Sequence, residues 1–240
     1  SFAFQTLLYG WTVVFGFMLL PLLVAPRIWC VDFGKIWSLV VLWLLARIVG
    51  VDHQVRGQEN IPDGPLLYAF KHQSAWETVA LNRLIYDPAI VLKRELSFIP
   101  FYGWFLVKTG MIPIDRARGG AALRQMLDAA RTRLSEGRSI VTFPEGTRTA
   151  VGAQARYHPG IFALYAALDA PVVPVALNSG LCWPRRGSVI RPGRITVEYL
   201  PLIPSGLRRK EFMALLEDRI ETATTRLVSE AKQDNSSRPT

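Results

Sequence analysis

The N-terminal part of the chain is almost continuously apolar. Positions 1–26 contain no charged residue. As one helix, residues 7–25 would be about 28 Å long, close to the thickness of the hydrocarbon core of a bilayer. Pro21 and Pro26 are expected to kink or end this helix, because proline removes a backbone donor and clashes with the preceding turn. The pattern predicts a first helix that is embedded in a membrane.

A second apolar run follows at residues 36–46, between Lys35 and Arg47. It is too short to span a bilayer, so it is expected to be an interfacial, re-entrant or buried helix. Together the two runs predict a membrane-embedded two-helix anchor over residues 1–50. The alternative is a buried helical hairpin of a soluble domain.

After Gly50, short apolar runs alternate with amphipathic helical patterns. The apolar runs predict strands at residues 65–70, 89–92, 111–114, 139–143 and 172–177. The helical patterns cover residues 122–134, 160–170 and 212–227, and residues 191–194 predict a turn between two more strands. This alternation indicates an α/β domain over residues 51–232, with a mixed, largely parallel sheet flanked by helices. The polar residues 233–240 are expected to form a disordered tail.

The charge balance favours an anionic partner. The chain carries 28 basic and 19 acidic residues, a net charge of +9, which suits nucleic acid, anionic lipid or an acidic carrier protein. Basic residues outnumber acidic ones most clearly over residues 185–210, where Glu198 is the only acid. This stretch is expected to dock an acidic carrier protein or to lie on lipid headgroups, and the alternative is a solvated basic face. The three histidines, His53, His72 and His158, share no metal-ligand spacing, so no metal is expected.

One histidine stands where α/β sheets place ligands. His72 follows a predicted strand and precedes a helix, and Glu77 comes five residues later. The carboxylate can fold back to the imidazole, fix its tautomer and stabilise it when it accepts a proton. The alternative is that Ser74 and Glu77 form a capping box, which requires no chemistry. The two interpretations are compatible.

Two further segments place cations at strand ends. In residues 143–148, Gly146 permits a close backbone approach and Arg148 can hold a phosphate through two hydrogen bonds. Arg116 ends the segment 112–116 in the same way. The alternatives are a tight turn with a surface ion pair and a solvated charge beside a neighbouring acid.

Four segments of the chain carry the comparison with a known family: residues 72–77, 112–116, 143–148 and 172–175. Their order and spacing resemble the sequence blocks of the glycerolipid acyltransferase family, particularly its bacterial 1-acyl-glycerol-3-phosphate O-acyltransferases. The resemblance covers about residues 57–203, and the apolar N-terminus is similar to the family's two-helix anchor. The family usually has Asp where this chain has Glu77.

The resemblance implies a mechanism. His72 would be the general base that deprotonates a glycerol hydroxyl, and Glu77 would orient it. The alkoxide would attack an acyl thioester without a covalent acyl-enzyme. The resemblance also implies a set of residues that bind the acceptor: Lys93, Arg116, Glu145, Gly146, Thr147 and Arg148. An acyl carrier protein or coenzyme A thioester would be the co-substrate, and no other cofactor is expected.

The function that follows is acylation of lysophosphatidic acid to phosphatidic acid, at the cytoplasmic face of the cell inner membrane and in contact with membrane lipids. One alternative keeps the chemistry and changes the acceptor to another lyso-lipid, such as a lyso-amino-acid lipid. A second is a membrane-anchored lipid or thioester hydrolase, although no G-x-S-x-G motif is present. A nucleic-acid-binding module is disfavoured, because it would leave His72 and Glu77 without a role.

Overall fold

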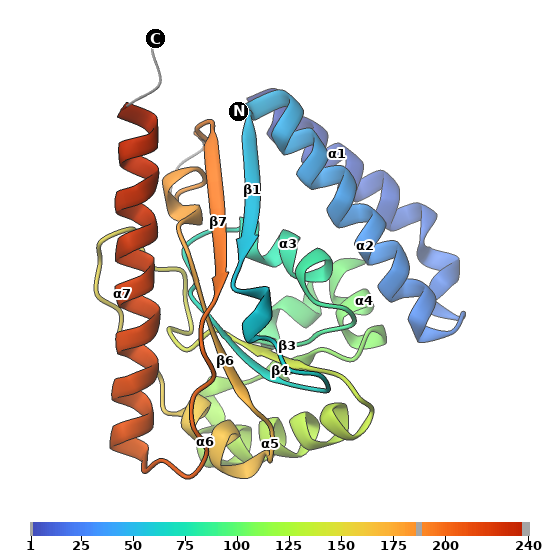
Figure 1. Cartoon of the computed structure of the whole chain (residues 1–240). Helices are drawn as coiled ribbons and strands as arrows, with labels where there is room; N and C mark the ends of the chain where they lie inside the picture. Colours follow the sequence, from blue (N-terminus) through green and yellow to red (C-terminus); the bar gives the residue numbers. More distant parts are fainter. Residues whose placement is uncertain (1, 186–188, 237–240) are drawn as a thin grey trace.

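The computed structural model describes residues 2–185 and 189–236. One seven-stranded sheet forms the centre, in the order β1-β7-β6-β2-β5-β3-β4 (Figure 1). Its strands are β1 (Val51–Arg56), β2 (Leu67–Phe70), β3 (Ala89–Lys93), β4 (Ile112–Ile114), β5 (Ile140–Thr142), β6 (Val172–Leu177) and β7 (Gly193–Tyr199). Neighbouring strands are parallel except β6 and β7, which are antiparallel. The expected mixed, largely parallel sheet is confirmed.

Helices cover both faces of this sheet. They are α1 (Phe2–Met18), α2 (Arg27–Leu44), α3 (Trp76–Leu84), α4 (Tyr102–Lys108), α5 (Gly120–Ser135), α6 (Gly160–Ala167) and α7 (Arg209–Ser236). Alternate residues of β2 enter opposite cores, as the period of a strand requires. Tyr68 and Phe70 pack with residues of α1, α2 and α3, whereas Leu67 and Ala69 pack with residues of α5, α6 and α7. The central strand is therefore buried on both sides.

The N-terminal helices differ from the prediction in where they end. The single helix expected at residues 7–25 is wrong, because α1 ends at Met18 and a short 3₁₀ helix, Leu20–Leu23, follows. Pro21 lies in this 3₁₀ helix and Pro26 precedes α2, so both prolines act as predicted.

The second helix is longer than the sequence pattern indicated. A π-helical segment, Leu45–Val49, continues α2, so that the helix from Arg27 to Val49 has 23 residues. In the described part of the chain, this helix alone is long and apolar enough to cross a membrane. The spanning candidate is therefore the second helix and not the first.

The strands predicted from apolar runs correspond to β2–β6, with ends that differ by at most two residues. The turn expected at residues 191–194 between two strands is wrong, because Gly193 already begins β7 and the described residues just before it form no strand. The partner of β7 is β1, with Val51 opposite Gly193. The sequence pattern missed β1 because most of its residues are polar or charged, as an edge strand with one free side allows.

The last helix also exceeds its predicted length. It continues to Ser236 and so includes residues 233–236, which were expected in a disordered tail. The remaining positions of that tail, 237–240, lie outside the described residues.

Candidate active site

His72 lies in the loop between β2 and α3, at the carboxyl edge of the sheet. Its imidazole stacks on the ring of Phe143, with centroids 4.0 Å apart, and its side chain is 12% exposed. The backbone N–H of Thr149 donates to the carbonyl of His72 at 2.7 Å. A nearly buried histidine whose loop is fixed by a neighbouring loop has the setting of a catalytic base.

Glu77 is fully buried in the first turn of α3. Its carboxylate accepts hydrogen bonds from the backbone N–H groups of Gln73 and Ser74, at 3.1 and 2.9 Å, and from the hydroxyl of Ser179. One carboxylate oxygen, Oε2, lies 3.6 Å from Nδ1 of His72. Because Nδ1 faces this carboxylate, Nε2 on the other side of the ring is the nitrogen left for a substrate proton.

The capping-box interpretation is also realised in part. Glu77 reaches back to the N–H of Ser74, as in that motif. The hydroxyl of Ser74 accepts from the N–H of Trp76 at 3.0 Å, one position earlier than the motif requires. The same carboxylate thus fixes the start of α3 and faces the imidazole.

The loop after β5 meets the end of β4 at Gly146. This glycine has φ +65°, and a Cβ added there would lie 2.7 Å from Nη1 of Arg116 and 2.8 Å from Cδ2 of His158. The guanidinium of Arg116 therefore lies directly over the Gly146 backbone. A side chain at position 146 would displace it and would strain a backbone with positive φ. The structure thus brings together Arg116 and Gly146, which are 30 positions apart in the sequence.

Arg148 comes next on the same loop. It is half-buried and lies near the Tyr102 hydroxyl on α4; burial raises the pKa of Tyr102, and the cation of Arg148 opposes this. Thr147 beside it is exposed. Neither Arg116 nor Arg148 forms an ion pair within the described part of the chain, so both guanidinium groups are available to an anion.

Lys93 lies at the end of β3, opposite Ile114 in the register of β3 and β4. Its side chain is exposed and has no ion-pair partner within residues 2–185 and 189–236. The structure thus places Lys93 at the same edge of the sheet as Arg116.

Glu145 has a different position from the other residues of its loop. Its carboxylate is closed to solvent and forms an ion pair with Lys71, whose ammonium also binds Glu221 of α7 at 2.7 and 2.9 Å. The hydroxyl of Tyr157 donates to Glu221 at 2.8 Å. Burial raises the pKa of Glu145, and Lys71 opposes this. In this arrangement Glu145 joins the loops after β2 and β5 and presents no surface to a substrate.

Lys71, Glu221 and Tyr157 were missed by the sequence interpretation. The sequence position of Lys71 could have indicated its role. It is a cation directly after a strand of four apolar residues, where burying an unpaired charge would destabilise the fold, so an acidic partner is expected. The partner Glu221 lies 150 positions away and carried none.

The sequence was compared with models of known protein families. The family model described as Acyltransferase matches residues 52–178, which include His72, Glu77, Arg116 and Arg148. The chain belongs to the acyltransferase family.

Two relatives and one solved structure resemble this acyltransferase over most of its length. A Pseudomonas aeruginosa protein named 1-acyl-sn-glycerol-3-phosphate acyltransferase is 36% identical over 81% of the chain and 76% of that protein. The human 1-acyl-sn-glycerol-3-phosphate acyltransferase alpha is 26% identical over 94% of the chain and 80% of its own length. The crystal structure of the 1-acyl-sn-glycerophosphate (LPA) acyltransferase PlsC from Thermotoga maritima superimposes with a TM-score of 0.76. It is 20% identical, and the match covers 94% of this chain and 96% of that one. At this identity the structural match supports the fold.

Proposed function

We propose that this acyltransferase moves a fatty acyl group from a thioester to the free sn-2 hydroxyl of lysophosphatidic acid, giving phosphatidic acid. The observation that carries the proposal is the placement of two free guanidinium groups, Arg116 and Arg148, at the same sheet edge as the His72–Glu77 pair. A base and an anion site are what an acceptor with a hydroxyl and a phosphate requires. The names of the sequence relatives agree with this acceptor.

The chemistry uses one base. Nε2 of His72 takes the proton of the acceptor hydroxyl while the oxygen attacks the thioester carbonyl, and Glu77 stabilises the imidazolium that forms. As the tetrahedral intermediate collapses, the carbon–sulfur bond breaks and the imidazolium returns its proton to the leaving thiolate. The carbon–oxygen ester bond remains, so no acyl-enzyme is needed.

Arg148 tests the acceptor assignment. A guanidinium holds a phosphomonoester through parallel charge-assisted hydrogen bonds, so Arg148→Ala is expected to lower kcat/KM for lysophosphatidic acid by roughly ten- to a hundredfold. The assay follows a labelled acyl group into phosphatidic acid. A monoacylglycerol, which has the hydroxyl but no phosphate, is the control acceptor: wild type should use it poorly, and the variant should lose little more.

Two results would contradict this assignment. If Arg148→Ala loses the same factor on both acceptors, Arg148 supports the fold or the donor. If wild type prefers a lyso-lipid without a phosphomonoester, such as a lyso-amino-acid lipid, the alternative acceptor takes the place of lysophosphatidic acid.

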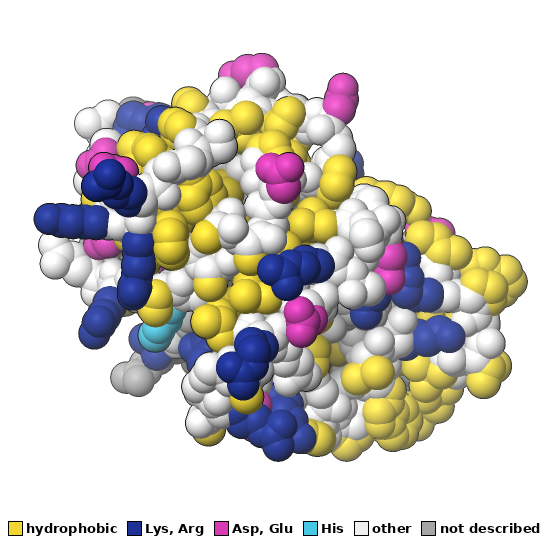
Figure 2. Space-filling model, turned by 90° about the horizontal axis from the view of Figure 1, so that it is seen from below, with side chains coloured by type: hydrophobic (Ala, Val, Ile, Leu, Met, Phe, Trp, Pro, Cys, Tyr) yellow, Lys and Arg dark blue, Asp and Glu magenta, His cyan; other side chains and the backbone are white. Residues whose placement is uncertain are grey.

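A continuous apolar surface supports the proposal that the enzyme binds to a membrane. It runs from the α1–α2 hairpin to α4, which lies against α2 and the 3₁₀ helix Leu20–Leu23. Phe17 and Phe101 join the two parts, with ring centroids 4.6 Å apart. Its exposed members include Val13, Phe17, Met18, Val24, Phe98, Trp104 and Val107. Figure 2 shows hydrophobic side chains gathered on the side where Figure 1 places the turn between α1 and α2. An exposed apolar surface of this extent is typical of a membrane or partner interface.

The packing of α2 favours insertion into one leaflet. Residues near both its ends, Cys30 and Leu42, are buried, because the helix lies along the domain against α3. At its start, Arg27 forms two hydrogen bonds of 2.7 Å with Asp87 of the domain. A helix held along the domain in this way cannot cross a bilayer while the domain stays outside it. We therefore propose that the hairpin and α4 insert into one leaflet of a membrane. That this membrane is the inner membrane and this leaflet the cytoplasmic one is part of the same proposal.

Introducing charged side chains into the apolar surface is expected to release the protein from membranes. The double variant Phe17→Glu, Val24→Glu should lose most of its binding to vesicles of phosphatidylethanolamine and phosphatidylglycerol, because burying a carboxylate in the bilayer is costly. Co-sedimentation measures the bound fraction. Leu123→Glu on α5 is the matched control, since Leu123 is exposed far from the hairpin, and it should bind like wild type. Equal release by both variants would contradict the proposed orientation.

A further inference from the structure

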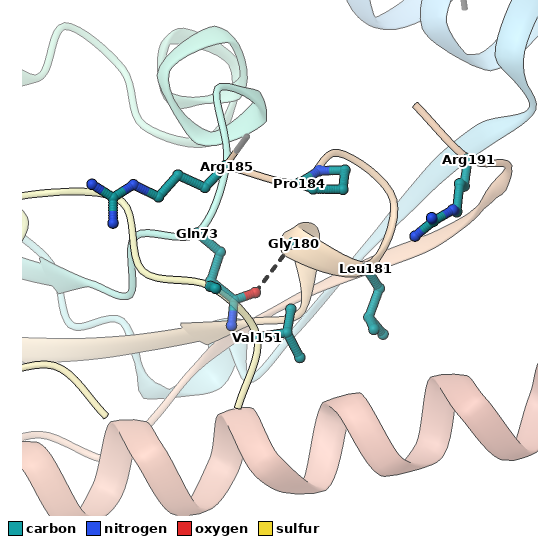
Figure 3. A pocket seen from close by; sticks show the side chains of 8 residues that line it. Gln73, Val151, Gly180, Leu181, Pro184, Arg185 and Arg191 are labelled. Carbon is teal, nitrogen blue, oxygen red and sulfur yellow. Dashed lines mark hydrogen bonds between the residues drawn. The ribbon is translucent and has the colours of Figure 1, made fainter. Parts of the chain in front are cut away.

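A cavity of about 440 Å³ opens beside Gln73, the residue that follows His72 (Figure 3). Val151, Leu181 and Pro184 give it apolar walls. Nothing in the acceptor site described above uses this cavity.

The order of the strands places the cavity relative to His72. His72 follows β2. Of the acceptor cations, Lys93 ends β3, and Arg116 and Arg148 follow β4 and β5; these three strands lie on one side of β2. Five lining residues lie between β6 and β7, on the other side of β2: Gly180, Leu181, Pro184, Arg185 and Arg191. Ala150 and Val151 come from the loop after β5 and close the cavity on the acceptor side. Acyl transfer brings two substrates to one base, and the sheet provides a cationic site on each side of it.

The polar groups of the cavity are suited to a ligand with an anion and amides. Arg185 and Arg191 lie at opposite ends of the cavity in Figure 3, with Gln73 between them. Neither arginine has an ion pair with another described residue.

Gln73 supplies a buried polar group. It is 1% exposed, and its Oε1 accepts from the N–H of Gly180 at 3.1 Å. Its amide nitrogen forms no hydrogen bond with another described residue and is not closed to solvent, so it can donate to a ligand in the cavity.

We propose that this cavity binds the 4′-phosphopantetheine arm of the acyl donor. The assignment rests on the proposed function, which requires a thioester substrate. The arm carries a phosphate at one end for Arg191, a gem-dimethyl group for the apolar walls, and amide carbonyls for the nitrogen of Gln73. Its other end is the thioester that must reach His72. Coenzyme A and acyl carrier protein share this arm, so the cavity serves either donor.

Arg191→Ala tests the phosphate contact. The variant is expected to raise KM about tenfold or more for acyl-phosphopantetheine, acyl-coenzyme A and acyl carrier protein thioesters alike. KM for lysophosphatidic acid should not change, and neither should KM for S-acyl-pantetheine, which lacks the phosphate. Arg131→Ala, an exposed arginine of α5 that pairs with Asp128, is the matched control and should leave every KM unchanged.

Other patterns would overturn the assignment. A rise in KM for the carrier protein alone means that Arg191 touches the carrier's surface, and a rise for coenzyme A alone means that it touches the nucleotide. If KM for S-acyl-pantetheine rises by the same factor, Arg191 does not contact the phosphate. If only KM for lysophosphatidic acid rises, the cavity belongs to the acceptor site.

A second variant fills the cavity. Leu181→Trp should raise KM for all four thioesters, including S-acyl-pantetheine, and leave KM for lysophosphatidic acid unchanged; an unchanged donor KM would overturn the assignment. The two proposals fail differently. A wild-type protein that does not acylate lysophosphatidic acid overturns the proposed function. A wild type that does so, with donor KM unaffected by Arg191→Ala and Leu181→Trp, overturns the cavity assignment alone.

Discussion

Replacing His72 with alanine is expected to lower kcat by about 10²–10⁴-fold while the protein stays folded. The side chain lies at a loop, is partly exposed and stacks on a single ring, that of Phe143, so its removal leaves the main core intact. The measurement is kcat of the purified variant with saturating thioester and lysophosphatidic acid, with circular dichroism to verify the fold. A variant that is folded and retains the kcat of wild type would contradict base catalysis by His72.

Glu77→Gln is the companion variant. The amide keeps the size of the carboxylate but loses its charge, and it turns one acceptor atom into a donor beside the groups that now donate to it. The imidazole remains, so kcat should fall less than in His72→Ala. If kcat does not change and only the stability falls, Glu77 serves solely as the cap of α3.

Lys71→Met is expected to destabilise the protein by about 3–5 kcal/mol, the cost of removing one partner of a buried ion pair. Glu145 would then be closed to solvent without its cation, whereas Glu221, 34% exposed, can be hydrated. Denaturant unfolding measures the change in the free energy of unfolding. The double variant Lys71→Met, Glu145→Gln should recover a large part of the loss, because no buried charge remains unpaired. A double variant as unstable as the single one would show that Lys71 acts through packing.

The pH dependence of the single variant follows from Glu145. Its pKa in the folded protein is already raised by burial, and the loss of Lys71 removes the group that opposes this. A folded-state pKa above the unfolded one favours folding at low pH, and the benefit is lost as pH rises through the raised value. The gap in stability between Lys71→Met and wild type should therefore narrow as the pH is lowered.

The features that the sequence predicted well are local ones. Buried strands such as β6 are continuous apolar runs, and the His72–Glu77 pair depends on a spacing within one loop and one helical turn. Both are determined by neighbouring residues in the chain, which is why pattern and spacing suffice.

The features that the sequence did not reveal depend on distant partners. The family resemblance placed Glu145 among the acceptor-binding residues, and nothing in its neighbourhood along the chain indicated its ion pair with Lys71 or, through Lys71, the link to Glu221. The edge strand β1 has almost no apolar pattern and is defined by its pairing with β7, more than 130 positions later. Sequence periodicity carries no information about such contacts.

The ion-pair cluster of Lys71, Glu145 and Glu221 joins residues that are synthesised at different times. Lys71 and Glu145 are synthesised before Glu221, so their ion pair can form before α7 is available to add the third charge. The α1–α2 hairpin emerges before any of them. The growing chain can thus meet the membrane surface while the loops around His72 still lack their support from α7.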